Sequence, residues 1–163
     1  MKKLILFLLV VASASAQDAA TEKAAIKSVL DLWHKAAAEA RFKPYFALMT
    51  DDAVFIGTDA TEYWTVEEFK AYAKPYFDKG KAWNFTAVER HIYLNPTNDI
   101  AWFDELLDTQ MKLCRGSGVL KKVNGQWRIA HYVLSMTVPN DIVDDVIKLK
   151  KTFDDELLKK RTP

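Results

Sequence analysis

The clearest hydrophobic pattern in the chain lies on either side of Asn124-Gly125. Apolar and β-branched residues alternate there with polar ones, which predicts two paired strands within residues 114–135. Asn-Gly favours a two-residue type I′ turn, because both central residues of that turn need a positive φ. A turn of this length fixes the register and places His131 opposite Gly118. We therefore expect His131 on the apolar face of the hairpin, where the glycine leaves room for a close approach.

Apolar residues elsewhere recur at the i, i+3, i+4, i+7 spacing of an amphipathic helix. This spacing predicts helices over residues 18–40, 65–80 and 140–160. Thr65 and Glu68 form the T-x-x-E sequence of a capping box at the start of the second of these. A shorter helix is predicted over 45–49, with Pro44 in its first turn.

The period changes to two over residues 83–94 and 99–109, which predicts two further strands joined by a short turn. One face of this pair would carry Arg90 and Glu105, and the other would carry Asp104. Both faces are partly apolar. We therefore expect one face in the core and the other against a partner.

The first residues have the order of a secretory signal peptide. Two lysines precede an apolar run over residues 4–11, and an A-x-A site ends at Ala16. The run is short for a membrane span, so cleavage after residue 16 is favoured over a retained anchor. We expect an exported protein, periplasmic or extracellular, with residues 17–163 forming one domain.

Composition excludes several partners. The formal net charge is +1, so no strong basic field is available to attract nucleic acid or an anionic membrane. The single cysteine cannot form a disulfide within the chain. The three histidines lack the spacing of metal ligands, so we expect neither a metal nor an organic cofactor.

Two helices, a strand, a helix and four antiparallel strands form an α+β order. Four segments in that order carry a resemblance to the SnoaL-like domains of the NTF2-like superfamily, namely DAVFIG at 52–57, the mouth segment 57–64, IAWF at 100–103 and NGQWRIAH at 124–131. The resemblance covers about residues 20–138. It implies a cone, in which a curved antiparallel sheet wraps around the N-terminal helix, and the C-terminal helix is an addition. Similar domains include isomerases, cyclases, dehydratases and binding modules, so the fold does not decide the function.

The best catalytic candidates are His131, Glu105 and Asp104. The imidazole of His131 titrates in the range that suits proton transfer near neutral pH, although it also suits a pocket wall. Arg90 and Glu105 share a face, where they would orient a ligand or form a structural ion pair. The ketosteroid isomerase pattern needs an inward tyrosine and two inward carboxylates, and the full set cannot be placed in this sequence.

Several residues are predicted to contact a ligand. Asp59 and Glu62 fall at the expected mouth of the cone, where acids act as a base or a gate or are simply solvated. Arg115 lies between glycines and offers a charge for an anion. The predicted ligand-binding residues are Trp33, Phe55, Asp59, Tyr63, Trp64, Arg90, Trp102, Glu105, Arg115 and His131.

Three functions remain open. The first is binding of a small, largely apolar molecule in the cone. The second is a proton-transfer enzyme, an isomerase or a lyase. The third is a dimeric interaction module without a ligand. A homodimer through the outer face of the sheet is expected, with the C-terminal helix as a competing cover for that face.

Overall fold

The computed structural model describes residues 2–161, with side chains from Asp18 onward. Within that range the chain forms, in order, α1 (Lys2–Ala38), α2 (Phe42–Ala47), β1 (Met49–Ile56), β2 (Tyr63–Thr65), α3 (Val66–Asp78), β3 (Phe85–Leu94), β4 (Ile100–Thr109), β5 (Lys112–Val123), β6 (Gln126–Met136), a 3₁₀ turn η1 (Asn140–Ile142) and α4 (Val143–Arg161). The predicted signal peptide, residues 1–16, lies outside the residues whose side chains are described. Among the described residues, no helix has the length and apolar character to cross a membrane.

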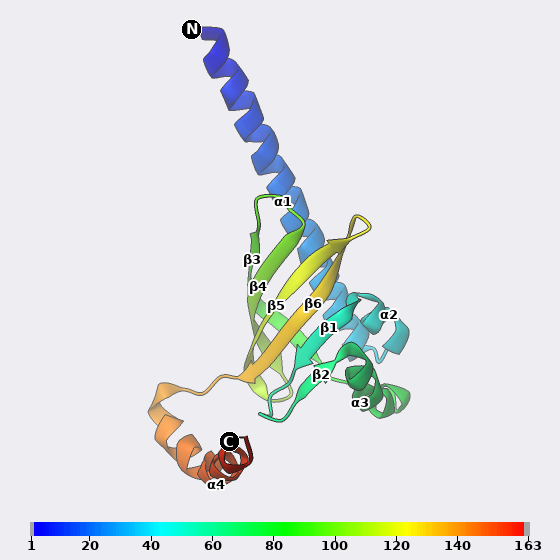
Figure 1. The fold of residues 1–163 in the computed structure, drawn as a ribbon, viewed down its shortest axis with the longest axis vertical. Coiled ribbons are helices and arrows are strands. Elements are labelled where there is room, and N and C mark those ends of the chain that lie inside the picture. The colour runs from blue at the N-terminus through cyan, green and yellow to red at the C-terminus, as the bar shows by residue number, and fades with distance from the viewer. Residues whose placement is uncertain (1, 162–163) are drawn as a thin grey trace.

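The six strands form one curved sheet in the order β2-β1-β6-β5-β4-β3. The second half of α1 runs along its concave side, and α2 and α3 lie beside β1 and β2 (Figure 1). The predicted α+β architecture, with the sheet wrapped around the N-terminal helix, is confirmed. One feature was not predicted: β1 pairs with β6 in parallel, whereas the other neighbours are antiparallel.

The core between α1 and the sheet is rich in aromatic rings. The apolar stripe of the helix predicted over residues 18–40 is buried at Ile26, Leu30, Trp33 and Ala37, and Trp33 is the largest of these side chains. The indole of Trp33 stacks on Tyr45 at 4.9 Å between ring centroids and meets Tyr132 edge-on at 4.8 Å. Phe55 of β1 and Phe69 of α3 stack at 4.0 Å and continue this core toward the wide end of the cone. Thr65 and Glu68 form the predicted capping box, so α3 begins where the sequence indicated.

From Glu89 onward, strands β3 and β4 present the predicted faces, and the register places Arg90 directly opposite Glu105. A bulge at Val88, which was predicted to share the face of Arg90, leaves that side chain 61% exposed. The turn is longer than the sequence suggested, because the side chain of Asn95 accepts the backbone N–H groups of Asp99 and Ile100. Asn98 takes a positive φ of 53° within this turn. The register therefore shifts by two residues, which leaves the faces unchanged because side chains alternate with a period of two.

The predicted inward position of His131 is wrong. The Asn124-Gly125 turn forms, but β6 carries a bulge, so that Ile129 pairs with Leu120 and His131 pairs with Val119. The extra residue exchanges the two faces beyond this point. His131 is half-buried on the outer face, and Tyr132 takes the inward place opposite Gly118. A Cβ at Gly118 would collide with the backbone carbonyl of His131, so this close approach needs glycine.

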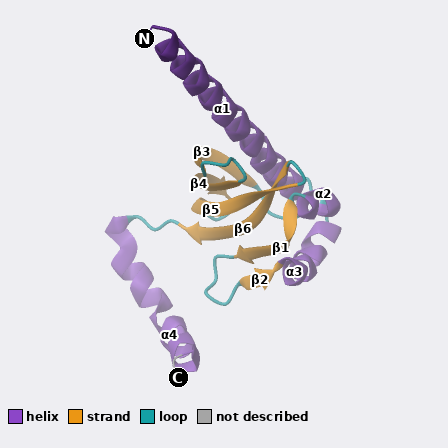
Figure 2. Cartoon of the chain, turned by 45° about the horizontal axis from the view of Figure 1, so that its top comes forward, coloured by secondary structure: helices purple, strands orange, loops and turns teal. Residues whose placement is uncertain are grey.

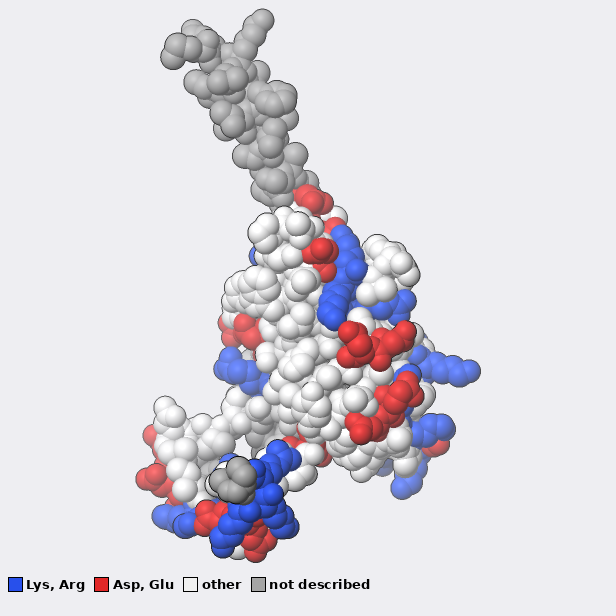
Figure 3. Space-filling view, viewed as in Figure 1, with Lys and Arg blue, Asp and Glu red and all other residues white. Residues whose placement is uncertain are grey.

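The C-terminal helix α4 forms as predicted and stands away from the sheet (Figure 2). An extended segment, Thr137–Pro139, carries it past the end of β6. Leu149 and Phe153 are about three-quarters exposed, so the apolar side of α4 does not cover the outer face of the sheet. Lys, Arg, Asp and Glu are intermixed on α4 and on the visible face of the body (Figure 3).

Candidate functional site

Glu105 is the centre of a buried polar cluster between α1 and the sheet. Its side chain is fully buried. Arg90 donates through Nε to Oε2 at 2.8 Å, and its Nη2 forms an ion pair with the same oxygen at 2.7 Å. His34 Nε2 lies 2.8 Å from Oε1, and the Tyr132 hydroxyl donates to that oxygen at 3.0 Å. Both carboxylate oxygens are therefore occupied by groups of this chain.

The cluster shifts the pKa values of Glu105 and Tyr132 in opposite directions. Burial opposes ionisation of Glu105, but the hydrogen bonds and charges of His34 and Arg90 outweigh it and hold the pKa of Glu105 below its usual value of 4.5. Burial, followed by the charge of Glu105, raises the pKa of Tyr132 well above its usual value. Glu105 is thus a weak base with no free oxygen. The predicted Arg90–Glu105 proximity is correct, and its geometry is that of a structural ion pair.

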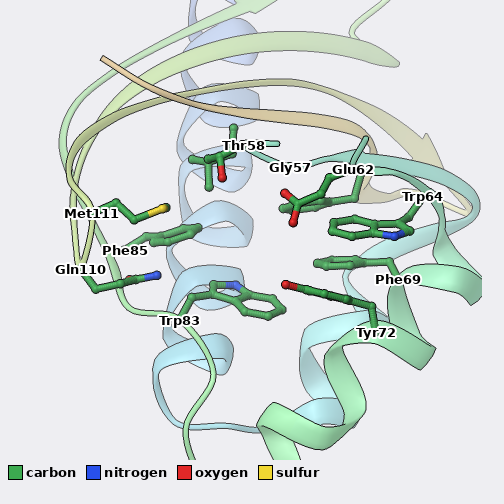
Figure 4. A pocket seen from close by; sticks show the side chains of 12 residues that line it. Gly57, Thr58, Glu62, Trp64, Phe69, Tyr72, Trp83, Phe85, Gln110 and Met111 are labelled. Carbon is green, nitrogen blue, oxygen red and sulfur yellow. The ribbon is translucent and has the colours of Figure 1, made fainter. Parts of the chain in front are cut away.

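A separate cavity of about 150 Å³ lies at the wide end of the cone. Strand β1, the loop after it, α3 and the turn between β4 and β5 contribute its walls (Figure 4). Its lining residues are Phe55, Gly57, Thr58, Glu62, Trp64, Phe69, Tyr72, Trp83, Phe85, Gln110, Met111 and Leu134. Most of them are aromatic or aliphatic, which is typical of a small-molecule site.

Glu62 is the charged group of the cavity, and the loop after β1 holds it in place. The backbone N–H of Asp59 donates to Glu62 Oε2 at 3.1 Å. Gly57 donates its N–H to the Glu62 carbonyl at 3.0 Å, which closes the loop. A Cβ at Gly57 would collide with Glu62 Oε2, so the glycine lets the carboxylate lie against the backbone. The carboxylate points into the cavity (Figure 4).

Two other polar groups face the same space. Tyr72 points its hydroxyl toward the centre of the cavity, and Gln110 points its amide nitrogen there from the opposite wall (Figure 4). Burial, with contributions from Tyr76 and from the charge of Glu62, raises the pKa of Tyr72 to about 12. The Gln110 Oε1 accepts the backbone N–H of Asn84 at 3.4 Å, which leaves its amide N–H groups for the cavity.

The aromatic walls are close to parallel. Trp64 and Phe69 are inclined by 14°, and Phe69 and Trp83 by 21°. Trp64 also stacks on Tyr72 at 4.4 Å. These rings stack on one another and form one aromatic wall, against which a flat ligand can pack, since offset stacking is a favoured arrangement of aromatic groups.

The structure distributes the predicted ligand-binding residues over several places. Phe55 and Trp64 line the cavity. Trp33 is in the core, and Arg90 and Glu105 belong to the buried cluster. Asp59 and Tyr63 border a wider gap of about 750 Å³ between the mouth loop and α4.

The remaining candidates lie on the outer face of the sheet. Trp102 is about half exposed and stacks on Tyr93 at 5.8 Å. Asp104 accepts a hydrogen bond from His91 at 3.0 Å. Arg115 is exposed, and His131 is half-buried on the same side. These four residues do not reach the cavity, because the sheet separates them from it.

Sequence reasoning missed His34 and Tyr132 as partners of Glu105, and Trp83, Phe85, Gln110 and Met111 as cavity residues. His34 lies one residue beyond Trp33 on the predicted helix and is buried, although its polarity suggested no inward position. The helix period alone places His34 beside the apolar stripe, so its burial could have been predicted from the sequence. Gln110 and Met111 lie in a turn, and only the curvature of the sheet brings them to the mouth.

Comparison with known proteins agrees with this architecture. The model of the SnoaL-like domain matches residues 26–139, and the chain belongs to this family. In the comparison with curated proteins, none matches the chain.

Among solved structures, the chain is similar to an NTF2-like protein of unknown function from Pseudomonas putida, with 16% identity, coverage of 76% of this chain and 91% of that one, and a TM-score of 0.62. It is similar to a candidate scytalone dehydratase from Novosphingobium aromaticivorans, with 12% identity, coverage of 76% and 89%, and a TM-score of 0.65. It is also similar to a candidate calcium/calmodulin-dependent protein kinase II association domain from Xanthomonas campestris, with 20% identity, coverage of 69% and 85%, and a TM-score of 0.54. Identities this low establish a shared fold alone.

Proposed function

We propose that this protein is an exported binding protein that holds a small, largely apolar molecule in the cavity at the wide end of the cone. The observation that supports this most directly is a cavity of about 150 Å³ with predominantly aromatic and aliphatic walls. An apolar cavity of similar size accommodates a molecule such as benzene. A single-ring ligand therefore matches both the volume and the aromatic wall.

Toluene should bind in this cavity, and filling the cavity should abolish the binding. Met111 lines the wall, and a Met111→Trp substitution puts a larger side chain into the same space. Because the ligand and the new indole compete for that volume, we expect toluene affinity to fall by at least about tenfold. Isothermal calorimetry and saturation-transfer NMR measure the change.

The matched control is Leu113→Trp, which adds an indole two residues away at an exposed position outside the cavity. It should leave toluene binding as in the unchanged protein. Thermal melts of both variants check that they fold. Equal toluene affinity in all three folded proteins would contradict the proposed site.

A proton-transfer enzyme is the alternative function, and Glu62 is the observation in its favour. No side chain of residues 18–161 donates to its Oε1, and the Tyr72 hydroxyl faces the same space. A base beside a phenol is a recurrent arrangement for proton abstraction. Binding is preferred here, because a second carboxylate or an imidazole is missing from the lining residues.

The export of the protein is proposed from the order of its first residues, which have a basic start, an apolar run and an A-x-A site. We expect the exported protein to begin at residue 17. Intact mass spectrometry of protein recovered from the periplasm or medium measures this directly, and a mass that retains Met1 would contradict it.

We also propose that the protein forms a homodimer through the outer face of the sheet. Tyr93, Ile100 and Trp102 are each 43–47% exposed on neighbouring strands, and α4 leaves them uncovered. A patch of this kind is commonly buried in a two-fold interface. The Trp102→Glu substitution should convert the dimer to a monomer, because it places a charge in the centre of that patch.

Light scattering at micromolar concentration measures the mass. The Leu149→Glu variant, on the exposed apolar side of α4, is the comparison and should remain dimeric. A dimer that dissociates with Leu149→Glu and persists with Trp102→Glu would place the interface on α4 instead.

A further inference from the structure

We propose that the ligand of the cavity is a small arylalkyl amine, a single aromatic ring with a protonated amino group on a short side chain, and that Glu62 is its counter-ion. This inference rests on the proposed binding function and specifies the charge of the ligand. Two independent observations support the inference: the shape of the cavity, and the negative charge of the carboxylate that lines it.

The shape selects one flat ring. The volume of about 150 Å³ is that of a cavity that takes benzene. Phe69 lies within 21° of parallel to both Trp64 and Trp83, so these stacked rings present an aromatic wall against which one flat ring can pack.

The charge selects a cation. Glu62 is the only carboxylic acid among the lining residues of this cavity, and none of them is basic. Its Oε2 is held by the N–H of Asp59, and no donor from residues 18–161 reaches Oε1. A carboxylate oxygen that faces apolar walls without a partner gains most from a charged donor. An ammonium group on the ligand supplies that donor.

The two neighbouring polar groups, Tyr72 and Gln110, also favour a cationic ligand over an anionic one. The pKa of Tyr72 is about 12, so its hydroxyl remains neutral near pH 7 and its oxygen can accept a second ammonium hydrogen. The Gln110 amide nitrogen, on the opposite wall, is the group that an anionic ligand would use. It is uncharged, so it does not offset the repulsion between Glu62 and an anion.

The basic residues nearest the mouth lie outside the cavity. Lys150, Lys160 and Arg161 of α4 border the wider gap on the other side of the mouth loop. Asp59 and Glu62 both border that gap, so these cations face the acids of the mouth loop from the side opposite the cavity. Binding experiments in about 150 mM salt reduce their influence further, since exposed charges are screened over roughly 8 Å.

Three probes of nearly equal size separate charge from shape: benzylamine, benzyl alcohol and benzoate. Calorimetry with the full exported protein at pH 7 measures their affinities. We expect benzylamine to bind at least about tenfold more tightly than benzyl alcohol, because a hydrogen bond between charged groups adds more than one between a neutral and a charged group. Benzoate should bind most weakly.

The Glu62→Gln substitution removes the charge and keeps an oxygen that can accept the Asp59 N–H. It should bring benzylamine and benzyl alcohol to within about twofold of each other. Asp59→Asn removes an equal charge from the same loop, outside the cavity, and should preserve the preference for benzylamine.

Equal affinities for benzylamine and benzyl alcohol in the unchanged protein, or tighter binding of benzoate, would overturn the inference. A preference that survives Glu62→Gln, or that disappears with Asp59→Asn, would overturn it as well. Toluene binding distinguishes these failures from failure of the proposed function. If toluene binds, the apolar site stands without the cationic ligand, and if neither toluene nor any of the three probes binds, both proposals fall.

Discussion

Replacing Glu105 by glutamine should destabilise the protein by about 3–5 kcal/mol, because it removes the fully buried counter-charge of Arg90 and leaves the guanidinium only its ion pair with the half-exposed Asp31. Both carboxylate oxygens accept from this cluster, so an amide nitrogen at either place would face another donor, from Arg90 or from His34 and Tyr132. Urea denaturation, with the slope compared between variants, measures the change in the free energy of unfolding.

Asp104→Asn is the matched control for this substitution. Asp104 is the preceding residue of β4 and faces outward, where its partner His91 is about half exposed. An exposed pair of this kind contributes only about 0–1 kcal/mol, so the control should be close to the unchanged protein. A loss below about 1 kcal/mol for Glu105→Gln would show that the cluster is not a major source of stability.

The same cluster predicts the response to acid. The pKa of Glu105 in the folded protein is below its usual value of 4.5. The contribution of its ionised form to stability is therefore fully present above about pH 4.5 and is lost as the pH falls below that value toward the folded pKa. The difference in stability between the unchanged protein and Glu105→Gln should narrow over that range.

Gly116→Ala should cost about 2–3 kcal/mol, because a methyl group there collides with the Tyr132 hydroxyl and disturbs its hydrogen bond to Glu105. The added Cβ would also lie 3.0 Å from Glu105 Cγ, a second contact inside the fully buried cluster. Gly116 is buried on β5, so the added methyl group cannot avoid these contacts by turning toward solvent. Urea denaturation again measures the loss.

Tyr132→Phe tests the cause of that loss. It removes the atom with which the new methyl group collides most closely, so Gly116→Ala and Tyr132→Phe together should be more stable than the sum of the single effects. Ser117→Ala, at the next residue of β5 on the other face, is the control and should change stability by less than about 0.5 kcal/mol. Simple additivity of Gly116→Ala and Tyr132→Phe would mean that the strain arises elsewhere.

The sequence by itself determined the local elements of this protein. The helix period located the buried stripe of α1, and T-x-x-E located the start of α3. Asn124-Gly125 determined a tight turn, and both residues have positive φ as that turn requires. These features depend on neighbouring residues and on intrinsic backbone preferences, which are legible in a single chain. The resemblance to the SnoaL-like domains then supplied the order in which the elements pack.

Part of the site was also predictable from alternation. Arg90 and Glu105 were placed on one face of their strands and Asp104 on the other, and a register error of two residues did not alter this. The bulge at Ala130 had the opposite effect, because a shift of one residue exchanges the faces. It moved His131 outward and brought Tyr132 to Glu105.

Tertiary structure alone decided where the cavity lies. Its walls come from β1, the mouth loop, α3 and the turn between β4 and β5, which are distant in sequence and meet only because the sheet curves around α1. The parallel pairing of β1 with β6 positions Phe55 and the mouth loop with Glu62 at that end of the cone. Such contacts form only when long stretches of chain are brought together and whole layers pack against each other. Neither the residue types nor their spacing along the chain predicts them.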